Sequence, residues 1–146
     1  MTNFPVPADQ LVPHRPPMLL IDALESLEGE VGQVSARIRE GNPLFDEDGL
    51  LAEAGLLELL AQSYAAVQGY ADSRSGGPIR QGFLVGVRKM EFLARPRLGD
   101  TLCIQVGAQA RLEGFAVVDG QVSRGDEILA QGKIKLWIVS QEGFAK

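Results

Sequence analysis

Cysteine and histidine are almost absent from this chain, which holds one of each among 146 residues. The single cysteine, Cys103, cannot form an internal disulfide, and it lies in an alternating run where a small hydrophobic residue is expected. One cysteine and one histidine, His14, cannot build a metal site without added carboxylates. We therefore expect the protein to use no metal and no other cofactor.

An excess of positive charge and a long uninterrupted hydrophobic run are also missing. The formal net charge of −5 argues against nucleic acid as a partner. Residues 1–10 lack the basic and then apolar pattern of a signal peptide, and polar residues interrupt the longest apolar stretch, which makes it a poor membrane span. These absences predict a cytoplasmic protein, and the length predicts one domain over residues 1–146.

The longest apolar stretch, residues 50–70, has leucine, alanine, valine or tyrosine at nearly every helical angle. A surface helix carries only one apolar stripe, so this pattern predicts a helix enclosed by other structure. Asp46 or Asp48 is expected to cap the helix. The negative charges of residues 46–48 are favourable next to the positive N-terminal end of the helix dipole. The serine, glycine and proline residues of 73–78 are expected to end it.

Alternating apolar residues predict two strands before this helix and four after it. The expected strands cover residues 18–27, 31–38, 82–93, 101–112, 115–124 and 128–139. This order describes an α+β protein in which an antiparallel β-sheet is wrapped around one long central helix. Tyr64 and Trp137 are most simply interpreted as core residues.

Two polar residues, Glu58 and Gln62, lie in the middle of the apolar stretch and share one helical face. An enclosed carboxylate is costly unless it is paired, protonated or facing a water-filled cleft. An apolar setting favours the protonated form, which suits a group that donates a proton to a hydroxyl. The alternative is a structural glutamate paired with an arginine, such as Arg80 or Arg88.

Positive charge gathers between residues 74 and 97. Apart from Arg74, the cations of this segment are Arg80, Arg88, Lys89, Arg95 and Arg97, and Glu91 is the only acid among them. A local basic face on an acidic protein can attract an anionic partner, and such an attraction weakens as salt is added. The alternative is a strand edge that its charges protect from aggregation.

Four sequence motifs occur in a characteristic order: LVPHRPPMLLID at 11–22, LLELLAQ at 56–62, GFLVGVRKMEF at 82–92 and RPRLGD at 95–100. Together they resemble the hotdog-fold 3-hydroxyacyl-[acyl-carrier-protein] dehydratases over roughly residues 8–139. The resemblance implies a hotdog fold, a lyase of fatty-acid biosynthesis and a dimer. Within the family, the chain is similar to a divergent branch, the dehydratase-like subunits of aryl-polyene clusters, some of which pair with a more orthodox dehydratase.

The resemblance also implies roles for individual residues. Glu58 falls on the position of the catalytic acid, Gln62 on a glutamine of the substrate site, and Gly86 beside the acyl thioester, although Gly86 is equally well explained as a strand bulge. The family's catalytic histidine, in a Gly-His-Phe-Pro-Gly loop, has no counterpart, because the chain runs through acidic residues 46–48 into an early helix. These acids could supply a base, although capping is favoured.

His14 is the only imidazole that could replace the missing histidine. It lies in a Pro-His-Arg-Pro-Pro turn, a motif that accompanies the catalytic histidine in the family. The resemblance therefore implies a structural role for His14, and a role as the base is the less favoured alternative.

Three functions are consistent with these features. The first is a dehydratase-like subunit that acts on 3-hydroxyacyl thioesters of acyl carrier protein or coenzyme A, with Glu58 as the acid. The missing histidine is then either supplied by a second hotdog subunit, in a homodimer or heterodimer, or replaced by another group. The second is an acyl thioesterase that uses Glu58. The third is a non-catalytic acyl-binding subunit. In each case the basic segment is a candidate docking surface for an acidic carrier protein.

Overall fold

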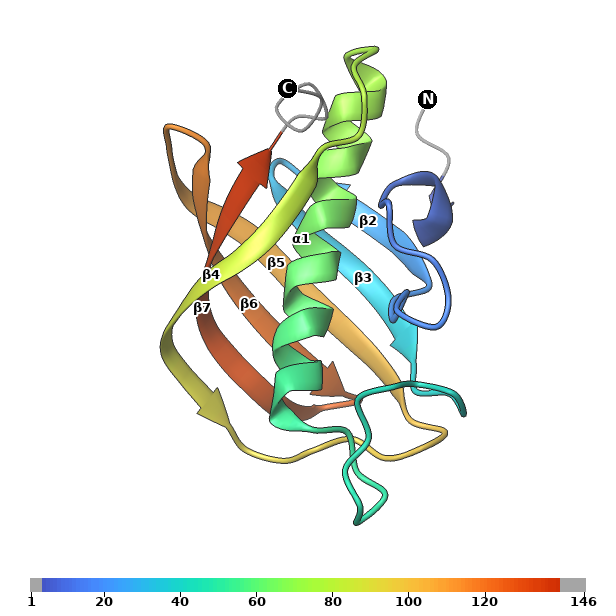
Figure 1. The fold of residues 1–146 in the computed structure, drawn as a ribbon. Coiled ribbons are helices and arrows are strands. Elements are labelled where there is room, and N and C mark those ends of the chain that lie inside the picture. Colours follow the sequence, from blue (N-terminus) through green and yellow to red (C-terminus); the bar gives the residue numbers. More distant parts are fainter. Residues whose placement is uncertain (1–3, 140–146) are drawn as a thin grey trace.

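The computed structural model describes residues 4–139, and it confirms the predicted architecture of one long helix against an antiparallel sheet. Helix α1 (Glu53–Arg74) lies along one face of a seven-stranded sheet (Figure 1). In spatial order the strands are β1 (Val6–Pro7), β2 (Ala23–Glu28), β3 (Val31–Arg37), β5 (Thr101–Leu112), β6 (Phe115–Arg124), β7 (Glu127–Val139) and β4 (Gln81–Phe92). Within the described range, no helix has the length and hydrophobicity needed to cross a membrane.

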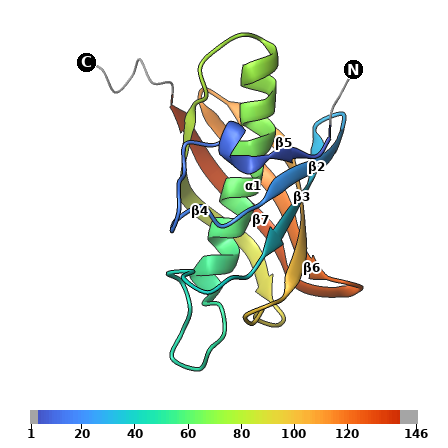
Figure 2. The same ribbon diagram turned by 90° about the vertical axis from the view of Figure 1, so that its right-hand side faces the viewer.

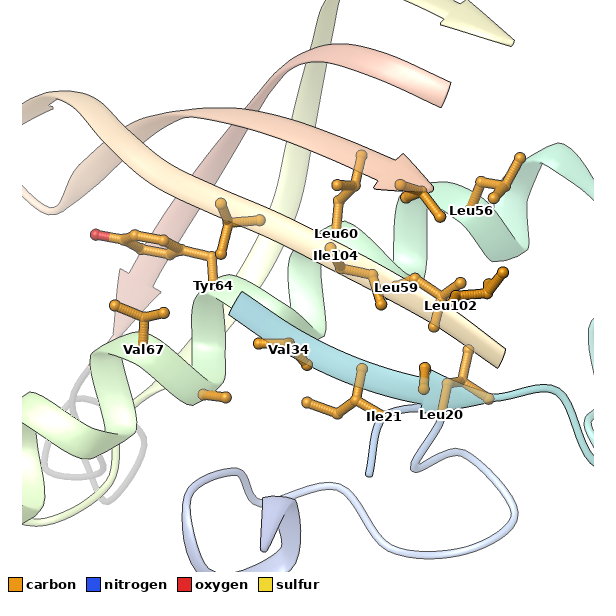
Figure 3. Close-up of a cluster of buried hydrophobic side chains, with 14 of the residues drawn as sticks. Leu20, Ile21, Val34, Leu56, Leu59, Leu60, Tyr64, Val67, Leu102 and Ile104 are labelled. Carbon is orange, nitrogen blue, oxygen red and sulfur yellow. The ribbon is translucent and has the colours of Figure 1, made fainter. Parts of the chain in front are cut away.

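The core forms where the leucines of α1 meet the inner face of the sheet. Leu59, Leu60 and Tyr64 are fully buried, and Figure 3 shows them among side chains from β3 and β5, including Val34 and Ile104. Burying one such side chain contributes about 1.5–3 kcal/mol. The burial of Tyr64 confirms its predicted place in the core.

The N-terminal segment covers part of the helix before the sheet begins. Figure 2 shows the 3₁₀ turn η1 (Ala8–Gln10) and β1 crossing α1 near its C-terminal half. Leu11 and Val12 are buried there. The contact is so close that an ideal Cβ atom on Gly69 would lie 1.9 Å from the carbonyl oxygen of Leu11. Glycine at this helical position therefore lets the segment that leads to His14 pack against the helix.

The helix begins at Glu53, and the predicted aspartate cap is wrong. The N-cap residue is Ala52, whose side chain makes no capping hydrogen bond. Asp46 and Asp48 instead form ion pairs with Arg95. Two isolated β-bridges, Phe45 with Leu51 and Leu50 with Arg97, place the loop that carries these aspartates beside the segment that follows β4.

The first long strand also starts later than predicted, at Ala23 rather than Met18. Residues 18–20 pack on the helix instead, where the backbone N–H of Leu20 donates a hydrogen bond to the Gln62 side chain. Trp137 is a second correction, because it is 39% exposed and packs edge-on against Phe115 at a centroid distance of 4.4 Å. An amphipathic indole on an outward-facing strand position satisfies the alternating pattern without entering the core.

Candidate active site around Glu58

Gln62 joins the helix to the loop that precedes β2. Its Nε2 atom donates to Glu58 Oε2 at 2.8 Å and to the carbonyl oxygen of Met18 at 2.7 Å. Its Oε1 atom accepts the N–H of Leu20 at 2.9 Å. Gln62 is fully buried, and these three bonds occupy both of its donor hydrogens and its acceptor oxygen. Within the described chain these bonds let Gln62 position Glu58 and the loop, and the substrate contact that the sequence predicted for Gln62 stays a prediction.

The same loop brings His14 to Glu58. The distance between His14 Nε2 and Glu58 Oε2 is 3.7 Å, and the two side chains are 26% and 28% exposed. The sequence favoured a structural role for His14 and offered an arginine partner for Glu58. In the structure, the partners of Glu58 are the imidazole and Gln62, whereas Arg80 binds Asp72.

Burial controls the charge of the imidazole. It lowers the pKa of His14 below its usual value, while Glu58 acts in the opposite direction and Arg15 in the same one. The His14 side chain is therefore mainly neutral at neutral pH. Its Nδ1 atom is buried and has no hydrogen-bond partner within residues 4–139, so no protein group there fixes the tautomer of the ring.

The carboxyl group of Glu58 lies on the side of α1 that the sheet leaves uncovered. Leu57, Ala61 and Ala65 are only partly buried on this side of the helix. A cleft of about 480 Å³ is found elsewhere, where its lining includes Gln105 and Gln121. Those side chains alternate with the buried residues of β5 and β6, which places that cleft on the outer face of the sheet. Glu58 is thus an accessible group on an open surface of the described chain.

Strand β4 forms the long edge of the sheet and presents an apolar surface. Leu84, Val85 and Val87 are 38%, 53% and 45% exposed. The strand pairs with β7 on one side, and it is the last strand in the sheet order. An exposed apolar edge of this length favours association with another chain.

The pairing of β4 with β7 shifts register between Leu84 and Gly86, so Gly86 lies directly after an irregularity in the strand. An ideal Cβ atom at this position would lie 3.5 Å from Lys135 Cβ, which is an ordinary van der Waals contact. The bulge that the sequence offered as an alternative is therefore present, and packing within the described chain does not by itself require glycine here.

The predicted docking cations fall into two groups. Arg80 and Arg95 are neutralised by ion pairs with aspartates. Arg88, Lys89 and Arg97 are exposed. Of the five predicted cations, these last three carry the positive charge that a partner would meet.

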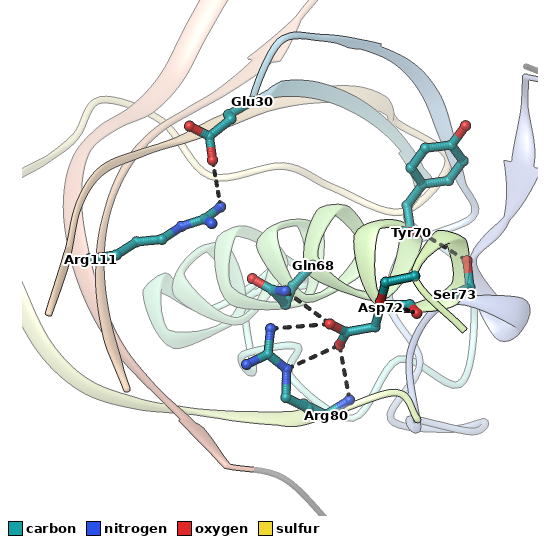
Figure 4. Close-up of polar contacts among 8 residues, drawn as sticks. Glu30, Gln68, Tyr70, Asp72, Ser73, Arg80 and Arg111 are labelled. Carbon is teal, nitrogen blue, oxygen red and sulfur yellow. Dashed lines mark hydrogen bonds and ion pairs between the residues drawn. The ribbon is translucent and has the colours of Figure 1, made fainter. Parts of the chain in front are cut away.

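The Arg80 ion pair anchors the C-terminal end of α1 to the start of β4. Figure 4 shows the Arg80 guanidinium facing the carboxylate of Asp72, which also accepts a hydrogen bond from Gln68 at 3.1 Å. Asp72 is only 8% exposed, so the guanidinium and the amide replace the water that this carboxylate would otherwise bind. Arg80 therefore serves the fold.

No cluster of three or more histidine, cysteine, aspartate or glutamate side chains within the described range is arranged to hold a metal ion. The candidate site thus consists of the Glu58 carboxyl group, the His14 imidazole and the Gln62 amide. These groups offer proton transfer and hydrogen bonding.

Comparison with known proteins identifies relatives over nearly the whole chain. The 3-hydroxyacyl-[acyl-carrier-protein] dehydratase FabZ of Oceanobacillus iheyensis is 32% identical over 130 residues, which cover 82% of this chain and 91% of the relative. The FabZ of Natranaerobius thermophilus is 29% identical over 136 residues, which cover 90% and 94% of the two chains.

Solved structures confirm the hotdog-type fold. The dehydratase heterocomplex ApeI:P from Xenorhabdus doucetiae matches with a TM-score of 0.86 at 21% identity, covering 96% of this chain and 95% of the other. A hypothetical thioesterase from Streptococcus pneumoniae, solved with coenzyme A, gives a TM-score of 0.60 at 14% identity and covers 81% and 85%. The family model described as ApeP dehydratase matches residues 6–143. The chain therefore belongs to the ApeP-like dehydratase family.

Proposed function

We propose that this protein is a dehydratase subunit that removes water from 3-hydroxyacyl thioesters carried by an acyl carrier protein. The observation that carries the proposal is the Glu58 carboxyl group, which Gln62 holds on the open side of the helix beside an imidazole. The names of the FabZ relatives supply the substrate class. The pathway expected for such a substrate is fatty-acid or polyketide-type synthesis.

The reaction requires a base for the C2 proton and an acid for the departing hydroxyl group. We assign the acid role to Glu58, because its carboxyl group is both accessible and held in place by Gln62. A thioesterase would use the same carboxylate to attack the thioester or to direct water at it. The two reactions give different products from one substrate.

The test is to incubate a 3-hydroxyacyl carrier protein with the purified chain, alone and with a second hotdog subunit, and to measure both enoyl thioester and free thiol. A dehydratase forms the enoyl thioester without releasing thiol. Thiol release as the main product would establish the thioesterase instead, and a lack of either product would leave an acyl-binding subunit.

We propose that the second subunit binds along β4. The heterocomplex among the structural neighbours contains two kinds of subunit, and here the exposed apolar residues of β4 lie on the long sheet edge. A partner there would pair with the edge strand and shield Leu84, Val85 and Val87 from water. A homodimer and a heterodimer of hotdog subunits use the edge in the same way.

Replacing Val85 by aspartate should weaken this association about 100-fold or more, because an unpaired charge buried in an interface costs on the order of 3 kcal/mol. Sedimentation or light scattering over a concentration series measures the effect. Val31→Asp is the matched control, since Val31 is 42% exposed at the start of β3, and β5, β6 and β7 lie between β3 and β4 in the sheet. Equal weakening by both variants, or by neither, would contradict an interface on β4.

The carrier protein is proposed to dock at the cationic surface formed by Arg88, Lys89 and Arg97. These side chains are exposed, whereas Arg80 and Arg95 are occupied by aspartates. An acidic carrier would be attracted by this surface, and its affinity would fall as salt screens the exposed charges.

A further inference from the structure

We propose that His14 is the base of the dehydration reaction, supplied by the same chain that supplies Glu58. This assignment rests on the dehydratase function proposed above and names the group that takes the C2 proton. It differs from the arrangement that the sequence favoured, in which a partner subunit supplies the histidine.

The backbone on both sides of His14 is fastened to the helix that carries Glu58. Before it, Leu11 packs on Gly69 in the close contact described above. After it, residues 18 and 20 are bonded to the Gln62 side chain. These two attachments to α1 fix the position of the His14 imidazole along the helix, beside the Glu58 carboxyl group. This is the positional order that a catalytic pair requires.

The turn itself is also braced. The Arg15 guanidinium donates hydrogen bonds to the carbonyl oxygens of Val12 at 2.9 Å and His14 at 2.6 Å. These bonds close the turn around the histidine, so its side chain is presented by a fixed backbone rather than by a free loop. A turn histidine with a purely structural role would be expected to bond through its ring nitrogens. Here Nδ1 has no such bond to the described residues, and Nε2 faces Glu58.

The electrostatic setting suits a base. Burial keeps the resting imidazole neutral and therefore able to accept a proton. Glu58, 3.7 Å from Nε2, stabilises the imidazolium that forms when the proton arrives. The tautomer that reacts carries its hydrogen on Nδ1 and leaves Nε2 free.

The reaction balances with one proton. The C2–H bond breaks and its proton moves to His14 Nε2, while the electron pair of that bond forms the C2–C3 double bond. The C3–O bond breaks as the hydroxyl group leaves. The proton passes from Nε2 to the Glu58 carboxylate and then to the departing hydroxyl, which becomes water. Both side chains return to their starting states, and no other reactant is consumed.

The base can be tested separately from the acid by using a substrate that cannot lose water. Butanoyl pantetheine thioester lacks the 3-hydroxyl group, so exchange of its C2 hydrogen with deuterium oxide reports only the base. We expect His14→Gln to lower the exchange rate by at least about 100-fold. Glu58→Gln should lower it by about tenfold or less, because one pKa unit of lost imidazolium stabilisation corresponds to a factor of ten. Mass spectrometry of the recovered thioester measures the exchange.

Two controls separate chemistry from folding. Asp9→Asn alters an exposed residue of the same N-terminal segment and should leave exchange unchanged. His14→Ala should regain exchange when free imidazole is added, because the histidine side chain is partly open to solvent and a small base can enter its place.

The outcomes are distinct. Exchange by His14→Gln at the wild-type rate would overturn the assignment while leaving the dehydratase function intact. Equal loss in Glu58→Gln and His14→Gln, with no rescue by imidazole, would make Glu58 the base and also overturn it. A wild-type protein that neither exchanges nor dehydrates, alone or with a second hotdog subunit, would remove the proposed function and the assignment together.

Discussion

Glu58→Gln is expected to lower the rate of 3-hydroxyacyl thioester dehydration by about 100- to 1,000-fold, within the range that a positioned acid contributes. Glutamine has nearly the same shape as glutamate and can still accept the Gln62 hydrogen bond through its amide oxygen, so the fold and the loop should be preserved. What the amide cannot do is give a proton to the departing hydroxyl. The absorbance of the enoyl thioester product measures the rate.

The matched control is Glu53→Gln, which changes an exposed glutamate in the first turn of the same helix. This variant removes the same charge from the same element, and its rate should stay close to that of the wild type. A wild-type rate for Glu58→Gln would show that its carboxyl group takes no part in the proton transfers. Unfolding curves recorded for both variants exclude a difference in stability as the cause.

Gly69→Ala is expected to lower the free energy of unfolding by about 2 kcal/mol, although alanine is intrinsically favoured over glycine in a helix by about 1 kcal/mol. The reason is the backbone of Leu11, whose carbonyl oxygen would lie 1.9 Å from the new Cβ atom. Backbone cannot rotate away as a side chain can, so the helix or the N-terminal segment must shift. Urea denaturation measures the change.

The substitution should also reduce dehydration, because the segment that must shift leads directly to His14. Gly77→Ala provides the control. An ideal Cβ atom on Gly77 would lie 3.8 Å from the carbonyl oxygen of Asp72, which is an ordinary van der Waals distance. Stability within about 0.5 kcal/mol of the wild type is expected for this variant. An equal or greater stability for Gly69→Ala would show that the close approach of the two backbones carries no strain.

Much of the fold could be predicted from local pattern. The stretch around Leu59 and Tyr64 is apolar at most helical angles, and that pattern alone predicted the central helix. The first halves of β5 and β6 alternate between buried and more exposed residues, because one face lies on the core and the other faces water. The observed bounds of β5 and β6 equal the predicted ones, and those of β4 and β7 differ by at most one residue at each end.

Features that depend on contacts distant in sequence could not be predicted in this way. The acids at 46 and 48 have the composition of a helix cap, but Arg95 draws them elsewhere. Such a competition between a local signal and a tertiary ion pair is decided only by the folded geometry. The exposed position of Trp137 did have a local signal in Lys133 and Lys135, which lie on the same face of the strand, but the large apolar residues beside Trp137 obscured it.

The central feature of the site was also hidden. Glu58 and Gln62 were recognisable as polar residues on one helical face. Their distance from His14 was not predictable, because strands β2 and β3 and the loop after them lie between the turn and the helix in the sequence. The amide bonds of Gln62 to the loop create that proximity. Gln62, set in an apolar helix, indicated that a polar partner would be buried beside it. The sequence could not show that this partner is the backbone of the loop that follows His14.

The short strand β1 has a consequence for how many copies can join. It contains two residues, Val6 and Pro7, and the proline has no N–H to offer a neighbouring chain. The other edge strand of the sheet is β4, which has twelve residues. Within the described part of the chain, it is the only edge strand long enough to form many backbone hydrogen bonds with another chain. If chains associate through β4, as proposed above, we therefore expect the assembly to stop at pairs, because the short strand at the other end of the sheet offers little edge for a further chain to extend.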